Sequence, residues 1–223
     1  MTRRMIGPLI FGLVGIAILL NLGFWQVRRL AWKNDIIASI EARLESESVA
    51  LPDEPTPEDS RYLLVRESGE ILPGEIHVYT SRSGDGVGYR VIVPFETAAG
   101  RRILLDRGFV PIADKDAERY LGPIEVEGAL DWPRETDSYT ADPDLEKNVW
   151  LARNVPKMAD HLETEPVLLV TSASSDPNQP VPMPVTVNIR NNHFEYAVTW
   201  FLLALVWAVM TVYLLWRIKR ADQ

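Results

Sequence analysis

The chain contains two uncharged apolar stretches, IGPLIFGLVGIAILLNLGFW at residues 6–25 and YAVTWFLLALVWAVMTVYLLW at residues 196–216. They run for 20 and 21 residues without Asp, Glu, Lys or Arg. With about 1.5 Å of rise per residue, each forms a helix of roughly 30 Å, which matches the hydrocarbon core of a bilayer. We therefore predict two transmembrane helices rather than two buried helices of a soluble protein.

Arg3 and Arg4 precede the first stretch, as basic residues do in a secretory signal peptide. The apolar region of a signal peptide is about 7–15 residues long, which is shorter than this stretch, and no small-residue cleavage site follows it. We expect an uncleaved anchor. No organelle-type presequence stands before it, so we expect a bacterial chain.

Two spans place both chain ends on one side of the membrane. The tails, residues 1–5 and 217–223, hold five basic residues and one acidic residue, so the positive-inside rule places them in the cytoplasm. Arg28, Arg29 and Lys33, beyond the first span, oppose this orientation. We predict a multi-pass protein of the bacterial inner membrane, with both termini cytoplasmic and the main domain periplasmic.

Composition excludes several classes of function. Outside the two tails the chain has 18 basic and 30 acidic residues, a net charge of −12, which does not suit a nucleic-acid partner. The chain has no cysteine, which rules out disulfides, CxxC redox chemistry, thiolate copper sites and covalently attached haem.

Between the spans we predict a helical extension at 26–50 and a periplasmic β-rich domain at 51–190. The second span and a short interfacial segment occupy 191–216. In the extension, Leu30 and Ile37 begin an apolar stripe with a spacing of seven residues, which is typical of a helix.

The domain reads as a series of strands with one short helix. The predicted strands are RYLLVRE (61–67), EIHVYTSR (75–82), GYRVIVPFE (88–96), RRILLDRGFV (101–110), IEVEGALDW (124–132), NVWLARN (148–154), EPVLLVTSAS (165–174) and VTVNIRN (185–191), and the helix is PKMADHLETE (156–165). The predicted fold class is α+β, with two transmembrane helices bracketing an antiparallel β-rich extracytoplasmic domain. A barrel and an open sheet both fit.

Several motifs have ordinary structural explanations. The glycines of SGDGVGYR (83–90) are not followed by a helix that could hold a phosphate, so they predict a hairpin turn. His77 alternates with apolar residues and is expected to face solvent, and His161 lies in the short helix; neither has the spacing of a zinc site. Asp106 and Arg107 are expected to form salt bridges of a hairpin.

The third histidine stands at the start of the second span. His193, Ala197, Trp200, Ala204 and Trp207 have spacings of four, three, four and three residues, so they share one helix face. Alanines between aromatic residues would leave a groove with an imidazole at its mouth, and imidazole is a common axial ligand of haem iron. Alternatively, the aromatic residues form an interfacial belt and the alanines serve helix packing.

Four stretches carry a resemblance to a known family. They are LGFWQVRRLAWK (22–33), GYRVIVPFETAAGRRILLDRGFVP (88–111), VWLARNVPKMA (149–159) and NNHFEYAVTWFLLA (191–204). In these motifs and in its two-span topology, the chain resembles the surfeit locus protein 1 family of cytochrome c oxidase assembly factors.

The resemblance implies an assembly role and no catalysis. Family members help to insert haem a into oxidase subunit I, and some bacterial members resemble haem a-binding proteins. It implies that His193 is the axial ligand of the iron and that Trp200 contacts the haem. Arg28 and Arg29 lie at a similar depth and are candidates for pairing with a haem propionate. Gln26, in the LGxWQxxR motif, is expected to be structural or to line the opposite wall.

The expected partners are subunit I with its assembly intermediates, haem a synthase and membrane lipid. A cofactor-free scaffold that stabilises an oxidase intermediate remains the main alternative. A two-span sensor would need a cytoplasmic output module, and a tethered enzyme would need a nucleophile–base pair or a metal cluster; the sequence offers neither.

Overall fold

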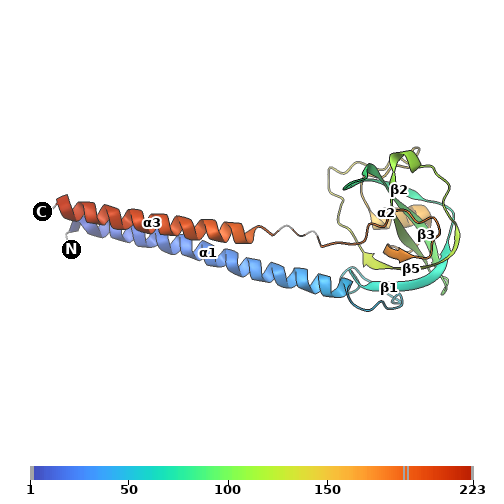
Figure 1. Cartoon of the computed structure of the whole chain (residues 1–223), viewed down its shortest axis with the longest axis horizontal. Coiled ribbons are helices and arrows are strands. Elements are labelled where there is room, and N and C mark those ends of the chain that lie inside the picture. Colours follow the sequence, from blue (N-terminus) through green and yellow to red (C-terminus); the bar gives the residue numbers. More distant parts are fainter. Residues whose placement is uncertain (1–2, 188, 190, 222–223) are drawn as a thin grey trace. The chain divides into compact units, whose positions relative to one another are not determined.

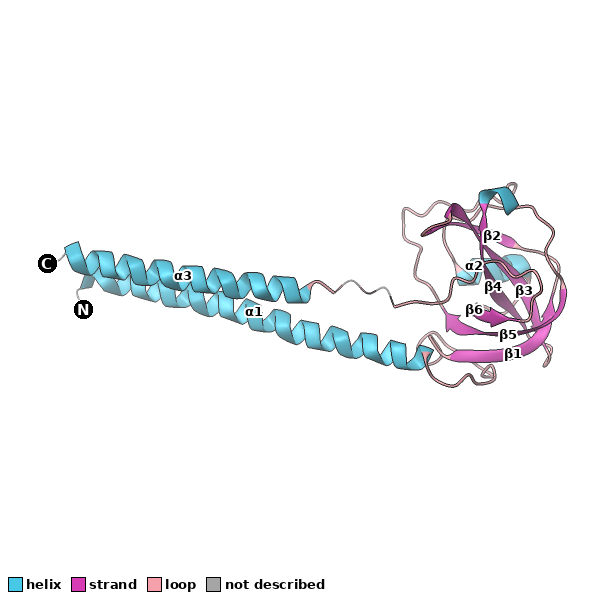
Figure 2. Cartoon of the chain, viewed as in Figure 1, coloured by secondary structure: helices cyan, strands magenta, loops and turns pink. Residues whose placement is uncertain are grey.

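The structure is a computed structural model that describes residues 3–187, 189 and 191–221. The chain forms two compact units, Met1–Ser39 with Val187–Gln223, and Ile40–Thr186. The first unit consists mainly of long helices, and the second unit contains the strands (Figures 1 and 2).

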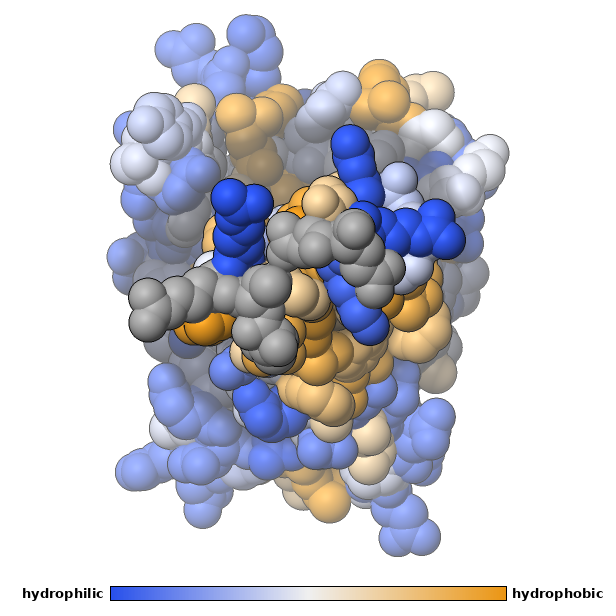
Figure 3. Space-filling view, turned by 90° about the vertical axis from the view of Figure 1, so that its left-hand side faces the viewer, coloured by the Kyte–Doolittle hydropathy of each residue, from blue (hydrophilic) through white to orange (hydrophobic). Residues whose placement is uncertain are grey.

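Helices α1 (Arg3–Leu44) and α3 (His193–Ala221) form the first unit, apart from the end of α1. Helix α1 continues without a break through the first apolar stretch and most of the predicted extension. Both helices are long and apolar enough to cross a membrane, and only 6% of the most apolar window of each is buried. Because a core helix of a soluble protein would be mostly buried, these are candidate membrane spans. Seen from the end near both termini, the pair carries apolar side chains behind a hydrophilic tip (Figure 3).

The two helices run antiparallel and contact each other through glycines of α1 and aromatic residues of α3 (Figure 1). A Cβ atom on Gly15 would lie 2.4 Å from Nε1 of Trp207, and one on Gly23 would lie 2.7 Å from Cε1 of Phe201. Nε1 of Trp207 donates a hydrogen bond of 3.2 Å to the carbonyl oxygen of Gly12. The glycines therefore let the rings lie directly on the α1 backbone, as small residues do between membrane helices.

The second unit is built on one six-stranded sheet in the order β1-β5-β6-β4-β3-β2. An additional pairing between β1 and β3 closes β1, β5, β6, β4 and β3 into a barrel, with β2 on the free part of the β3 edge. The strands are β1 (Leu64–Ile71), β2 (Ile76–Arg82), β3 (Gly86–Thr97), β4 (Arg102–Pro111), β5 (Gly122–Asp131) and β6 (Leu168–Ser174). A short 3₁₀ helix, η1 (Ile112–Asp114), follows β4.

The predicted β-rich α+β unit is confirmed, with one difference in strand direction. The predicted hairpin is present as β3 and β4, which pair from Gly88↔Pro111 to Glu96↔Arg102. However, β4 and β6 run parallel, whereas the other pairings of the sheet are antiparallel, so the sheet is mixed. Helix α2 (Val155–Leu162) lies in the connection from β5 to β6, so the chain between β4 and β6 contains β5 as well as α2.

Strand alternation divides the apolar side chains between two cores. Val91, Val93 and Phe95 of β3 belong to the larger cluster, whereas Ile92 belongs to a second cluster that also contains Met158 of α2. Successive side chains of a strand point to opposite faces, so β3 serves both cores at once.

Three local expectations were wrong. His77 is only 3% exposed, because its ring packs 5.7 Å from that of Tyr89 and its Nε2 lies 2.9 Å from Oε1 of Glu75. NVWLARN makes isolated bridges through Val149 and Trp150 but no strand. The predicted strand at 185–191 is absent from its described residues, and positions 188 and 190 lie outside them.

Candidate functional site

His193 is the first residue of α3, and its imidazole lies against α1. Its Nδ1 is 2.7 Å from Oε1 of Gln26, near the middle of α1. Gln26 is 8% exposed, while His193 is half-buried. The LGxWQxxR motif predicted that Gln26 is structural or lines the opposite wall, but the sequence does not show its contact with His193, because 167 residues separate the two.

The contact indicates which nitrogen of the His193 imidazole donates a hydrogen bond. An amide oxygen can only accept a hydrogen bond, so Nδ1 carries the proton and donates it. In a neutral histidine the other nitrogen then holds a free lone pair. Nε2 of His193 is thus the candidate metal-binding nitrogen of this ring. A histidine whose Nδ1 is held by a hydrogen bond, with Nε2 left for a ligand, suits an iron centre.

The remaining residues of the His193 face pack against α1. Ala197 and Ala204 are each 4% exposed, so they serve helix packing, and the open groove expected above them is absent. Trp200 is half-buried beside Phe201, at the level of Gly23. It lies two turns, about 10 Å, along the helix from His193.

The two arginines differ in position. Since a helix turns by about 100° per residue, Arg29 lies roughly 60° around α1 from Gln26, whereas Arg28 lies almost on the opposite side. The guanidinium carbon of Arg29 is 3.8 Å from the ring centre of Trp32. Arg29 is therefore the nearer of the two to the face that meets His193.

Another polar contact joins α1 to the segment just before α3. Nδ2 of Asn191 donates a hydrogen bond of 2.8 Å to Oδ1 of Asn34 in α1. Asn34 lies just over two turns beyond Gln26, so this bond is independent of the imidazole.

In the second unit, ionisable residues form internal ion pairs. Asp106 pairs with Arg90 across the β3–β4 hairpin, as expected, and Arg107 pairs with Asp176. Burial acts to raise the pKa of the Glu135 carboxyl, but hydrogen bonds and positive charge from Arg153 outweigh it, and the pKa lies below its usual value. Within the described ranges, no three His, Asp or Glu side chains form a group that could hold a metal ion.

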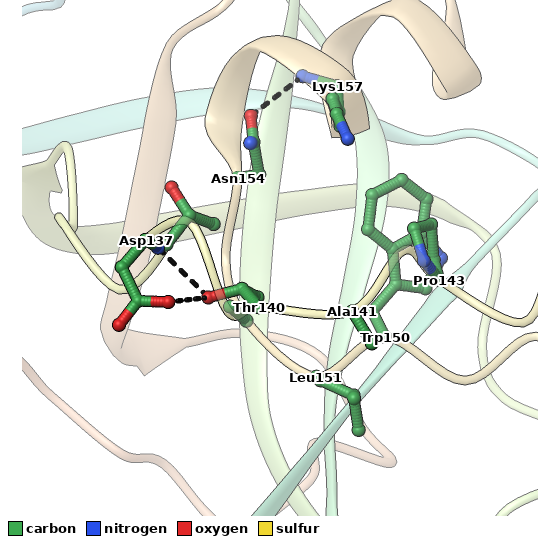
Figure 4. Close-up of a pocket in the computed structure, with 10 residues that line it drawn as sticks. Asp137, Thr140, Ala141, Pro143, Trp150, Leu151, Asn154 and Lys157 are labelled. Carbon is green, nitrogen blue, oxygen red and sulfur yellow. Dashed lines mark hydrogen bonds between the residues drawn. The ribbon is translucent and has the colours of Figure 1, made fainter.

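A small pocket of about 210 Å³ lies between the 136–154 loop and the start of α2 (Figure 4). Thr140 Oγ1 accepts a hydrogen bond from the Asp137 N–H, and Asn154 caps α2 by accepting from the Lys157 N–H at 3.1 Å. Ligand pockets usually measure about 300–1,000 Å³, and these polar groups already bond to one another. We therefore attribute this pocket to the conformation of the loop and not to a ligand site.

The fold and the site define a class of protein that has a small β-barrel domain and two candidate membrane helices. A histidine of one helix is hydrogen-bonded to the other helix. Comparisons with known proteins give the family. The model of the SURF1 family matches residues 13–205. A SURF1-like protein of Rickettsia felis is 30% identical, over 92% of this chain and 94% of its own length.

Similar relatives occur in distant organisms. A SURF1-like protein of Rickettsia bellii is 31% identical over 86% of this chain and 84% of its own length. Surfeit locus protein 1 of Gallus gallus is 32% identical over 81% of this chain and 66% of its own length. The chain belongs to the SURF1 family, which is known as a family of cytochrome c oxidase assembly factors rather than catalysts.

Proposed function

We propose that this chain assists the assembly of cytochrome c oxidase by binding haem a beside the start of α3 and delivering it to subunit I. His193 carries the proposal, because Gln26 holds its Nδ1 and leaves the Nε2 lone pair for iron. Haem a, if bound, would supply an iron centre that Nε2 of His193 would hold. The chain's own part is to present the imidazole, to offer Trp200 as an apolar contact and to exclude water.

A carrier must also release its ligand. A single imidazole ligand is compatible with transfer, whereas two strong axial ligands would oppose it. Arg29 is the better candidate for a propionate, because it lies nearer than Arg28 to the Gln26 face of α1. This role would require the guanidinium to leave the ring of Trp32.

The proposed location is the bacterial inner membrane, with both termini in the cytoplasm. The last turn of α3 carries Lys219 and Arg220, which supports this orientation by the positive-inside rule. The β-barrel unit would then be periplasmic. Its proposed partners are subunit I, assembly intermediates and haem a synthase.

The reduced absorption spectrum tests this function. The protein is expressed in membranes that make haem a and purified in detergent, beside His193→Ala. We expect a haem a band in the wild type and its loss or shift in the variant. An unchanged spectrum and stoichiometry in His193→Ala would exclude this ligand.

A cofactor-free scaffold is the second candidate, and the packing of Ala197 and Ala204 against α1 favours it, because no open groove remains there. A scaffold predicts a colourless protein that still co-purifies with oxidase intermediates. A coloured wild type would exclude it.

A further inference from the structure

Gln26 is a polar residue that directly follows the apolar stretch of α1 and precedes Arg28 by two residues. Its side chain is 8% exposed, although its neighbours Trp25 and Val27 are 49% and 43% exposed. A polar group removed from water is costly unless it forms a hydrogen bond. The described partner of Gln26 is Nδ1 of His193.

The local packing sets the side-chain length needed for the hydrogen bond between Gln26 and His193. Gly23, one turn before Gln26, touches the ring of Phe201, so the α1 backbone lies close to α3 at this level. The amide then reaches Nδ1 at 2.7 Å, a good hydrogen-bond distance. Asparagine, shorter by one methylene, would leave the oxygen about 1.5 Å short.

The direction of the bond has a chemical consequence. The imidazole can be protonated on either nitrogen, and the hydrogen bond to one nitrogen decides which carries the proton. An acceptor at Nδ1 selects the form in which Nε2 is free. Such a partner orients a metal-binding histidine and raises its basicity, and its loss usually reduces metal affinity about 10–100-fold.

We propose that Gln26 is a positioning residue for His193, which orients the imidazole with Nε2 available as the ligand before haem a arrives. The inference rests on the proposed function, because a ligand-selecting bond has a purpose only where iron binds. It assigns to α1 a specific chemical part in haem binding, although no residue of α1 need touch the iron.

The chain offers matched variants for a test. Gln26→Leu keeps the size of the side chain but removes the acceptor, and Gln26→Glu keeps an acceptor. Asn34→Leu removes the hydrogen bond from Asn191 to α1 and keeps the Gln26–His193 contact. Thermal unfolding of all three in detergent identifies any variant that fails to fold.

The first measurement needs no haem. Two-bond ¹H–¹⁵N correlation spectra of histidine-labelled full-length protein, with His193 assigned from the His193→Ala spectrum, report which ring nitrogen carries the proton. We expect the Nδ1–H form in the wild type and in Asn34→Leu, and a mixture in Gln26→Leu. A wild type with the proton on Nε2 would overturn the proposal.

The second measurement is haem a titration with the reduced spectrum and reduction potential. We expect Gln26→Leu to bind about 10–100-fold more weakly, Asn34→Leu to match the wild type, and Gln26→Glu to bind with a lower potential, because a carboxylate makes the imidazole a stronger donor. Wild-type affinity in Gln26→Leu would overturn the positioning role and leave the proposed function standing. A colourless wild type would overturn both.

Discussion

Breaking the ion pair between Arg107 and Asp176 should strongly destabilise the β-barrel unit. Both side chains are 2% exposed; Nε of Arg107 lies 3.1 Å from Oδ2 of Asp176, and Nη2 donates to the same oxygen. Nη1 of Arg107 has no hydrogen-bond partner in the described part of the chain. Asp176→Asn would leave a buried guanidinium without a counter-charge, which costs about 3–5 kcal/mol of unfolding free energy. For 150–250 residues this lowers Tm by about 6–20 °C.

Differential scanning calorimetry of the full-length protein in detergent measures the effect. Glu96→Gln serves as the control, because its pair with Arg102 is exposed (38% and 53%) and contributes at most about 1 kcal/mol. The double variant Arg107→Met/Asp176→Leu should recover part of the loss, since apolar side chains of similar volume replace a buried pair well. If Asp176→Asn and Glu96→Gln have the same Tm, burial of the Arg107–Asp176 pair does not increase its contribution to stability.

Three further perturbations test other parts of the structure. The folded-state pKa of Glu135 lies below the ordinary value of 4.5, because Arg153 outweighs the opposing effect of burial. Its stabilisation is therefore complete above that value and lost as pH falls through the folded-state pKa, so Glu135→Gln should flatten the plot of unfolding free energy against pH below about pH 4.5. Gly15→Ile should displace the indole packed on it and shift tryptophan fluorescence, whereas Gly7→Ile, with no atom within 4 Å of its Cβ position, should not; equal spectra would refute the contact. Phe95→Ala, at a fully buried position, should cost about 3–5 kcal/mol in chemical denaturation, and a loss below about 1 kcal/mol would contradict the assigned core.

Patterns within short stretches of sequence were sufficient to predict the β3–β4 hairpin. The strand-forming residues of GYRVIVPFE predicted β3, and the turn residues after it predicted the hairpin with β4. Alternation failed at His77, because a neighbouring tyrosine and the salt-bridged Glu75 cover the face that it assigned to solvent. The strand predicted at NVWLARN was also wrong, because Trp150 forms a single bridge to Val78 without extending the sheet.

At the His193 site, too, the sequence predicted one part of the structure and not the other. Helical spacing placed His193, Ala197 and Ala204 on one face, and the structure puts both alanines in the packed interface between α1 and α3. Spacing within one helix carries no information about the helix that covers it. The bond to Gln26 was therefore invisible until both helices were placed.

The sequence by itself determined the two apolar helices, the β-rich domain between them and the histidine at the start of the second helix. These follow from charge-free length and short-range periodicity, which act over a few neighbouring residues. Only the tertiary structure decided the closure of the barrel through β1 and β3, the parallel pairing of β4 with β6 and the partner of the imidazole. Each depends on contacts between distant segments, whose geometry is set by the packing of the whole chain.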